Sequence, residues 1–479
     1  MHPPKLMRLL RYEDDGRLTI ASFDDNAIPQ YAILSHTWGA DAEEVTFADL
    51  AEGGGMHKPG YKKIRFCGEQ AQQDGLQYFW VDTCCIDKSD KAELSLAIQS
   101  MFRWYQNATK CYVYLSDVST KKRKADSLCT EFTWEPAFRL SRWFTRGWTL
   151  QELLAPSTIT GIPYEALDGV PLSQFSVDDR LRWKGDRQTK REEDAWYSLL
   201  GIFDVEIAPA YSEGAANAFK RLKDEIDKLQ TCIRDIRYTD PSDDKKRIED
   251  TKGGLLADSY RWVLDNTTFQ QWQQWQQEPN NRLLWIKGDP GKGKTMLLCG
   301  IINELQGSMS QSTLLSYFFC QATDARINSA TAVLRGLLHM LLTQQPSLTS
   351  HVRKKHDQAG KAIFEDANAW VVLTEIFEAV LHDPGLRMTY LIIDALDECV
   401  TNLPKLLEFV AKQSSASSHV KWIVSSRNWP DIEAQLELAG DKVKLSLELN
   451  AQSVAAAVDV FIQRKVDQLA REKHYKPER

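Results

Sequence analysis

Residues 281–300 read NRLLWIKGDPGKGKTMLLCG, and this stretch decides the fold of the second half of the chain. The apolar run 283–286 is typical of a buried strand, and an apolar, helix-forming segment begins at Met296. Between them lies the pattern Gly-x-x-x-x-Gly-Lys-Thr, in the strand–loop–helix setting that a P-loop requires. The stretch therefore predicts a loop that binds the phosphates of a nucleoside triphosphate.

The residue types of this loop fit that role. Glycines let the backbone approach phosphate oxygens and adopt positive φ values, and the following helix turns its positive end toward the anion. We expect Lys294 to contact the β- and γ-phosphates and Thr295 to offer a hydroxyl to Mg²⁺. The expected nucleotide-binding residues are Gly288, Asp289, Pro290, Gly291, Lys292, Gly293, Lys294 and Thr295.

A second apolar strand, within MTYLIIDALDE at 388–398, ends in carboxylates. Such residues on a loop usually mark only a solvated turn, but here they follow a buried strand in a chain that has a P-loop. This placement fits a Walker B element. We predict that Asp394 holds Mg²⁺ together with Thr295, and that Asp397 and Glu398 polarise the attacking water.

A further strand at 420–424 leads to Arg427. The planar fork of an arginine suits contact with a γ-phosphate, so Arg427 is a candidate phosphate sensor. A surface salt bridge is the alternative role for this side chain.

Composition excludes several classes of protein. With 479 residues the chain is long enough for about three domains, and its net charge of -7 argues against a nucleic-acid binder, which needs a basic surface. The spacing of the nine cysteines indicates neither a disulfide framework nor a metal site. Since we see no signal peptide or membrane-spanning run, we expect a cytoplasmic protein with no transmembrane segment.

The first half of the chain alternates between strands and helices. Apolar, β-rich runs at 31–34, 78–82 and 111–115 surround an amphipathic helix at 93–107. This alternation predicts a parallel sheet with helices on both faces, that is, an α/β fold. The segment 141–156 is expected to form a further helix with one apolar side.

The motifs of this half resemble the HET domain of fungal heterokaryon-incompatibility proteins over about the first 225 residues. They are LSHTWG at 34–39, VDTCCID at 81–87, RGWTLQELLAP at 146–156 and AWYSLLGIF at 195–203. The resemblance implies a fold related to TIR domains. In catalytic TIR domains a glutamate works in NAD⁺ cleavage, and Glu152 matches its position.

Two interpretations of Glu152 stay open. A carboxylate in a partly apolar site can stabilise an oxocarbenium-like centre, or Glu152 can pair with Arg146 and fix a helix. A hydrolase triad of Ser35 and His36 with Asp82 or Asp87 is disfavoured, because nothing supports an oxyanion hole and the serine lacks the Gly-x-Ser-x-Gly elbow. We expect His36 to hydrogen-bond within its motif, while Asp82, at a strand end, is a weak site candidate.

The second half resembles the NACHT class of signal-transduction NTPases over about residues 256–449. GDPGKGKT at 288–295, LIIDALDE at 391–398 and IVSSRNWP at 423–430 stand in the family order. The resemblance implies a receptor-like (STAND, NLR-like) switch. In such a switch NTP binding causes self-association, and the HET domain then triggers cell death. A protein trigger of unknown identity is implied, and hydrolysis is expected to be slow.

We divide the chain into a HET domain at 1–228, a linker and packing segment at 229–282, a NACHT core at 283–450 and the start of a helical segment at 451–479. No winged-helix segment or repeat follows, so either the sequence is truncated or sensing comes from another chain. ATP and GTP both remain candidates. Two alternatives are a non-enzymatic HET interaction module on a slow NTPase, and a P-loop motor or kinase.

Overall fold

The structure is a computed structural model of the chain. It describes residues 6–472 except 14, 25–26, 119–134, 151–161, 168–169, 171, 253, 256–259, 276–281, 310–312, 416, 438–441 and 449. Two compact units are present, Met1–Asp227 and Lys228–Arg479.

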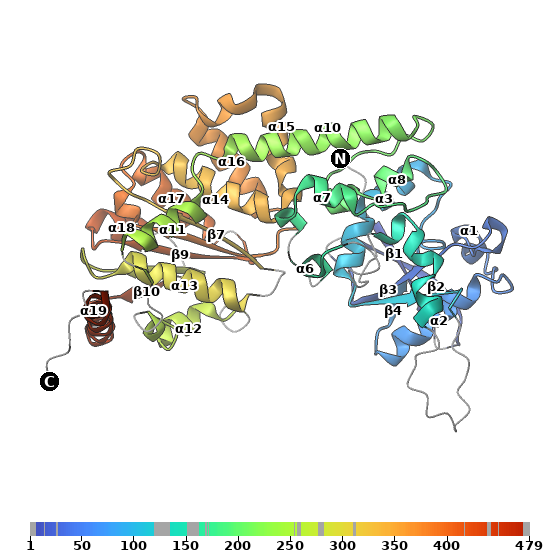
Figure 1. Cartoon of the computed structure of the whole chain (residues 1–479), viewed down its shortest axis with the longest axis horizontal. Coiled ribbons are helices and arrows are strands. Elements are labelled where there is room, and N and C mark those ends of the chain that lie inside the picture. Colours follow the sequence, from blue (N-terminus) through green and yellow to red (C-terminus); the bar gives the residue numbers. More distant parts are fainter. Residues whose placement is uncertain are drawn as a thin grey trace, which may run out of the picture. The chain divides into compact units, whose positions relative to one another are not determined.

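The first unit is built on a five-stranded sheet in the order β2-β1-β4-β3-β5 (Figure 1). β4, β3 and β5 are parallel, whereas β1 pairs antiparallel with β2 and with β4. The expected parallel α/β arrangement is confirmed, and the β1–β2 hairpin is an addition to it. The strands are β1 (Leu6–Tyr12), β2 (Leu18–Asp24), β3 (Tyr31–His36), β4 (Tyr78–Trp80) and β5 (Lys110–Tyr114).

Helices cover both faces of this sheet. On one face, Tyr112 of β5 donates its hydroxyl to the Gln70 carbonyl of α2 (Tyr61–Gln73). On the other, Tyr31 of β3 donates to the Trp104 carbonyl of α3 (Lys91–Asn107). Further helical segments are η1 (Asp41–Glu43), α1 (Phe47–Ala51), α4 (Glu135–Arg139), α6 (Tyr164–Leu167), η4 (Leu172–Gln174), α7 (Val177–Arg182), α8 (Asp194–Tyr197) and α9 (Leu200–Phe203). The boundary between the two units falls within α10 (Ala215–Ile236).

The prediction of a helix at 141–156 is wrong for residues 141–150, which are the part that the structure describes. Two short 3-10 turns stand there instead, η2 (Arg142–Thr145) and η3 (Trp148–Leu150). Between them Arg146 is extended, and the Gly147 amide donates to the carbonyl of Gln188 at 3.0 Å. A bond to a distant segment has replaced the local helical bond, which a pattern of apolar spacing does not reveal.

The second unit carries five parallel strands in the order β10-β6-β9-β8-β7. This confirms the parallel-sheet core expected around the P-loop. The edge strand β10 was not expected, since its sequence KVKLS is short and alternates with lysine. The strands are β6 (Leu283–Lys287), β7 (Thr313–Phe319), β8 (Met388–Asp394), β9 (Val420–Ser426) and β10 (Lys442–Ser446).

Alternate residues of these strands enter two apolar cores, one on each face of the sheet. On β8, Leu391 and Ile393 join the core beneath α14, α16 and α17, whereas Tyr390 and Ile392 join the core beneath α12 and α13 (Figure 1). The helical segments are α11 (Pro241–Thr251), η6 (Arg261–Val263), α12 (Thr267–Gln273), α13 (Lys294–Ser308), α14 (Ala330–Gln344), η7 (Pro346–Leu348), α15 (Thr349–Ala359), η8 (Gly360–Phe364), α16 (Ala369–Leu381), η9 (Leu396–Glu398), α17 (Leu403–Gln413), α18 (Pro430–Glu437) and α19 (Ala451–Glu472).

Much of the segment interpreted as a linker is helical. Asp240 caps α11 through its side chain and Pro241 occupies the first turn, so residues that suggested a break begin a helix instead. Downstream, Phe269 and Trp272 of α12 lie in the core beneath the sheet. The expectation that this tryptophan-rich part packs onto the nucleotide-binding core is confirmed.

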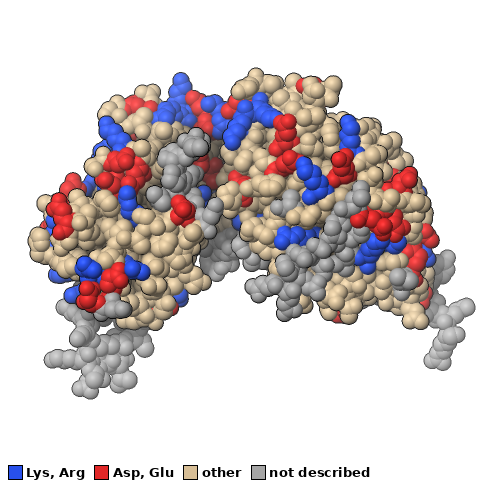
Figure 2. All heavy atoms as spheres, turned by 180° about the vertical axis from the view of Figure 1, so that it is seen from behind, with Lys and Arg blue, Asp and Glu red and all other residues tan. Residues whose placement is uncertain are grey.

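The described surface has charges of both signs. Figure 2 shows Lys and Arg side chains interspersed with Asp and Glu over the visible face. Among the described residues, no helix is both long and apolar enough to cross a membrane.

Candidate functional site

The P-loop joins β6 to α13, as its pattern predicts. Gly291 and Gly293 have φ values of 79° and 82°, and an added Cβ at either would meet no neighbour within 4 Å. These two glycines are therefore required by backbone conformation and not by space. Gly288 differs, because a Cβ there would lie 3.1 Å from the side chain of Leu447.

Lys294 is the first residue of α13 and turns back over the loop. Its ammonium donates to the carbonyls of Gly288 at 2.5 Å and Asp289 at 3.1 Å. Partial burial lowers the pKa of Lys294, and the carboxylates of Asp397 and Asp394 oppose that shift. The ammonium is thus held by two backbone carbonyls of the loop.

Asp394 lies at the carboxyl end of β8 with 2% of its surface exposed. Its Oδ1 accepts a hydrogen bond from Ser425 Oγ at 2.5 Å, and its carboxylate also accepts one from Thr295. Burial raises the pKa of Asp394, and these two hydrogen bonds oppose the rise. The structure therefore brings together the two residues predicted to hold a metal ion.

This donor set fits Mg²⁺, which prefers a hydroxyl and a carboxylate supplemented by water and phosphate oxygens. Thr295 and Asp394 supply that pair at the mouth of the loop. Among the described residues, no group of three or more His, Cys, Asp and Glu is placed to bind a metal by itself.

Asp397, which is buried, pairs with the partly exposed Arg427 beside this centre. Arg427 Nε lies 2.9 Å from Asp397 Oδ2, and the Arg427 amide donates to Oδ1 at 2.9 Å. Only 2% of the Asp397 side chain is exposed, against 40% of Arg427. The salt-bridge role of Arg427 is therefore observed, and its contact with a γ-phosphate stays a prediction.

Glu398 is held more loosely than Asp397. One oxygen accepts from the Ala322 amide at 3.1 Å, the other lies 3.7 Å from Arg427 Nη2, and 33% of the side chain is exposed. Of the two predicted catalytic carboxylates, Glu398 is the one with an oxygen able to meet water. Both are carried by η9, which follows Ala395 at a left-handed φ of 53°.

Three residues that sequence reasoning did not assign to the site also contact it. Ser425 bonds Asp394 as described, and Glu448 accepts from the Asp289 amide at 2.7 Å. Asn428 also donates to Asp289, at 3.2 Å. A strand that ends Ser-Ser-Arg beside a Walker B strand could have drawn attention to Ser425. Nothing local marks Glu448.

The loop residues Pro290 and Lys292 are exposed, in contrast to Lys294. No described contact of the Lys292 side chain restricts it. Its assignment to nucleotide binding stays a prediction that rests on its backbone amide alone.

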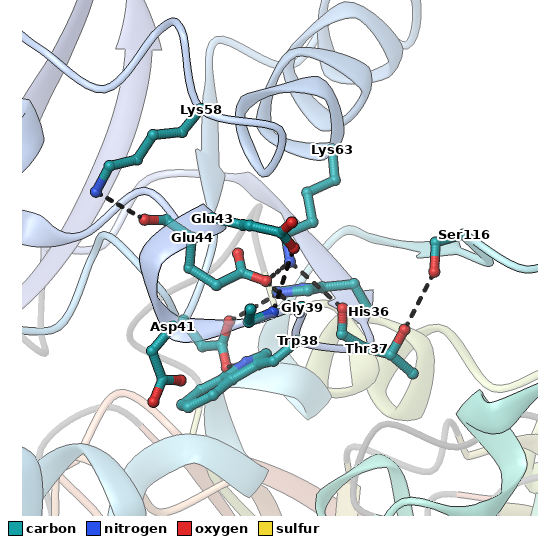
Figure 3. A network of polar contacts seen from close by, with 12 residues as sticks. His36, Thr37, Trp38, Gly39, Asp41, Glu43, Glu44, Lys58, Lys63 and Ser116 are labelled. Atoms are coloured by element: carbon teal, nitrogen blue, oxygen red, sulfur yellow. Dashed lines mark hydrogen bonds and ion pairs between the residues drawn. The ribbon is translucent and has the colours of Figure 1, made fainter.

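In the first unit the LSHTWG segment forms a buried polar network (Figure 3). Lys63 donates to Glu44 Oε1 at 2.6 Å and to the Thr37 carbonyl at 3.4 Å. The Gly39 amide also donates to Glu44 Oε1. Since Lys63 and Glu44 are about 5% and 6% exposed, this pair fixes the loop after β3 onto α2.

His36 and Asp82 meet at the carboxyl ends of β3 and β4. His36 Nε2 lies 3.4 Å from Asp82 Oδ1, and Trp38 Nε1 donates to Asp82 Oδ2 at 2.7 Å. Burial lowers the pKa of His36 to about 4, so the imidazole is neutral at physiological pH. Ser35, its neighbour in the strand, instead accepts from Trp143 Nε1, so these residues do not form a triad.

Glu152, the candidate for NAD⁺ cleavage, lies outside the described residues. Thr149, three positions earlier, is buried and donates to the carbonyls of Trp143 and Arg146, both at 2.7 Å. The described part of the motif is therefore anchored next to Ser35 through Trp143.

Two family models each match a part of one unit. The family model described as heterokaryon incompatibility protein (HET) matches residues 31–138, and the NACHT-associated model described as nephrocystin 3, N-terminal matches residues 258–427. The chain is 58% identical to vegetative incompatibility protein HET-E-1 of Podospora anserina, over 97% of this chain and 36% of that protein. It therefore spans about a third of that relative's length.

Solved structures give weaker similarities. The ORC1 protein of Aeropyrum pernix in complex with DNA is 13% identical, with a TM-score of 0.23 over 45% of this chain and 51% of that chain. Drosophila ORC bound to DNA is 16% identical, with a TM-score of 0.21 over 48% and 50%. Scores of this size establish no shared overall arrangement.

Proposed function

Since the chain carries a HET domain followed by a P-loop NTPase-like unit, we propose that it is a nucleotide-dependent switch of vegetative incompatibility. In this proposal NTP binding by the second unit promotes self-association. Association of the first units then starts a response that ends in cell death. The identity with HET-E-1 supports the biological setting, and an as yet unidentified protein acts as trigger.

The main support for the proposal is that Asp394, at the end of β8, lies beside Lys294 and Thr295 of the phosphate-binding loop. Lys294 would leave the carbonyls of Gly288 and Asp289 to meet the β- and γ-phosphates. Thr295 and Asp394 would hold Mg²⁺, which when bound neutralises phosphate charge. The two glycines at positive φ and the start of α13 would supply backbone amides to the phosphates.

Hydrolysis is assigned to Glu398, with slow turnover. Glu398 is oriented by the Ala322 amide and partly exposed, so it can accept a hydrogen bond from the attacking water. Asp397 has both oxygens bound to Arg427, so its role is to place that guanidinium. A switch requires a long-lived NTP state, and slow hydrolysis provides it.

The binding experiment compares two lysines of the same loop. Purified protein is titrated with fluorescent ATP and GTP in Mg²⁺, and its mass is followed by light scattering. Lys294→Ala should weaken binding by about 100-fold or more and abolish NTP-dependent association. Lys292→Ala, which removes an exposed charge from the same loop, should do neither. Equal nucleotide affinity of the two variants would refute the proposed nucleotide site. Rapid multiple turnover of NTP would favour a motor or a kinase over a switch.

For the first unit we propose NAD⁺ cleavage with Glu152 as the catalytic carboxylate. The support is the motif resemblance and the burial of the segment that leads to this residue. The test measures NAD⁺ loss by protein clustered with NTP, comparing Glu152→Gln with Glu165→Gln, an exposed carboxylate of α6. Loss of NAD⁺ with the wild type and Glu165→Gln, but not with Glu152→Gln, supports NAD⁺ cleavage by Glu152. Equal loss in both variants, or none in the wild type, favours a non-enzymatic interaction module.

A further inference from the structure

The hydroxyl of Ser425 occupies a junction in the nucleotide site. It donates to Asp394 Oδ1 at 2.5 Å and accepts from the Ala395 amide at 2.9 Å. Ser425 and its two partners are each at most 8% exposed, so water does not replace these bonds. One hydroxyl therefore satisfies both a carboxylate and a backbone amide.

These two bonds act on different parts of the site. The bond to Oδ1 restrains the rotation of the Asp394 carboxylate, which also accepts a hydrogen bond from Thr295. The bond from the Ala395 amide restrains a residue whose φ of 53° is unusual for a side chain other than glycine. That turn begins η9, which delivers Asp397 and Glu398.

We infer that Ser425 is a positioning residue for the bound divalent cation and for the hydrolytic carboxylates. The inference rests on the proposed nucleotide function and extends it to a residue that contacts neither phosphate nor metal. The role of the hydroxyl is to orient the Asp394 carboxylate so that it can contact both Thr295 and an Mg²⁺ ion.

The neighbouring residue provides a matched control. Ser426 lies on the same strand, is also fully buried, and accepts from Trp285 Nε1 at 2.9 Å. Consecutive residues of a strand point to opposite faces, so Ser426 lies away from the carboxylate. Ser425→Ala and Ser426→Ala thus remove the same atom from the same strand, and only the first touches Asp394.

The experiment measures binding of fluorescent ATP by the full chain while Mg²⁺ is titrated, and repeats it in excess EDTA. Ser425→Ala should raise the Mg²⁺ concentration for half-maximal binding by about tenfold, which corresponds to the loss of one hydrogen bond to a charged group. Affinity in EDTA should stay within about twofold of the wild type. Ser426→Ala should keep the wild-type Mg²⁺ requirement, and Ser425→Thr, which retains the hydroxyl, should recover most of it.

Each other outcome has a distinct meaning. Equal Mg²⁺ requirements for the two alanine variants would overturn the inference and leave the proposed function standing. Weakened binding of Ser425→Ala in EDTA as well would overturn it too, since the hydroxyl would then serve only to fold the loop. If the wild type binds no ATP or GTP, the proposed function fails and the inference fails with it.

Discussion

Arg427 binds both oxygens of Asp397, through Nε to Oδ2 at 2.9 Å and through its own backbone amide to Oδ1 at 2.9 Å. The second bond depends on the backbone and survives when the side chain is changed. If Arg427 contacts a γ-phosphate, as we predict, Asp397 and the nucleotide would compete for the same guanidinium.

The first prediction follows from this competition. Arg427→Ala should reduce the preference for ATP over ADP by about tenfold, because one charge-assisted contact to the γ-phosphate is lost. Arg427→Lys should restore little of it, since an ammonium lacks the planar fork. Competition binding with the two nucleotides measures the ratio. An unchanged ratio in Arg427→Ala would assign this side chain to the salt bridge alone.

The second prediction separates the two carboxylates of η9. Glu398→Gln should lower ATP hydrolysis by roughly 100-fold or more while leaving nucleotide affinity near the wild-type value, as expected for loss of a group that orients water. Asp397→Asn should have a smaller effect on hydrolysis and should alter the ATP-to-ADP preference instead. Single-turnover kinetics and binding are compared for both variants. The reverse pattern would exchange the two roles.

The third prediction concerns close packing behind the nucleotide loop. An added Cβ at Gly300 of α13 would lie 2.2 Å from the ring of Tyr260, whereas one at Gly307 of the same helix would meet nothing within 4 Å. Gly300→Ala should cost about 1–3 kcal/mol of unfolding free energy through overpacking. Gly307→Ala should stabilise the helix by about 0.5–1 kcal/mol. Urea unfolding gives both values, and destabilisation by Gly307→Ala would contradict the packing argument.

The fourth prediction concerns pH. The pKa of His36 falls from 6.5 to about 4 through burial, so between these values the unfolded chain binds the extra proton. The first unit should therefore lose stability as pH falls from about 6.5 to 4, by at most about 3 kcal/mol from this residue. His36→Gln should flatten that part of the pH profile, although its stability at neutral pH will be lower. Urea unfolding at a series of pH values measures the slope, and equal slopes would exclude His36 as its source.

Local sequence patterns predict the structure correctly where consecutive residues determine it. The run from Gly288 to Thr295 and the strand that ends at Asp394 each specify their own structure, because loop, strand and helix requirements agree there. The parallel sheet around them followed from the same agreement. Contacts between distant segments were not predictable in this way.

Ser425, Glu448 and Gly147 illustrate what was missed. Each is placed by a partner that is remote in sequence, namely Asp394, the Asp289 amide and the Gln188 carbonyl. Residue type alone does not choose among the many such pairings a chain can make. The helix prediction is wrong at 141–150 because the Gly147 amide bonds a distant carbonyl, which the apolar spacing of the segment does not reveal.

The strand order also has a consequence for synthesis of the chain. The strand that carries the phosphate-binding loop lies between β9 and β10, and its Trp285 bonds Ser426, 141 positions later. A ribosome must therefore release β9 and β10 before that strand has either neighbour. Pairings across such sequence separations form slowly. The nascent chain should consequently remain unable to bind nucleotide until β10 has left the ribosome, which delays the activity of a protein proposed to trigger cell death.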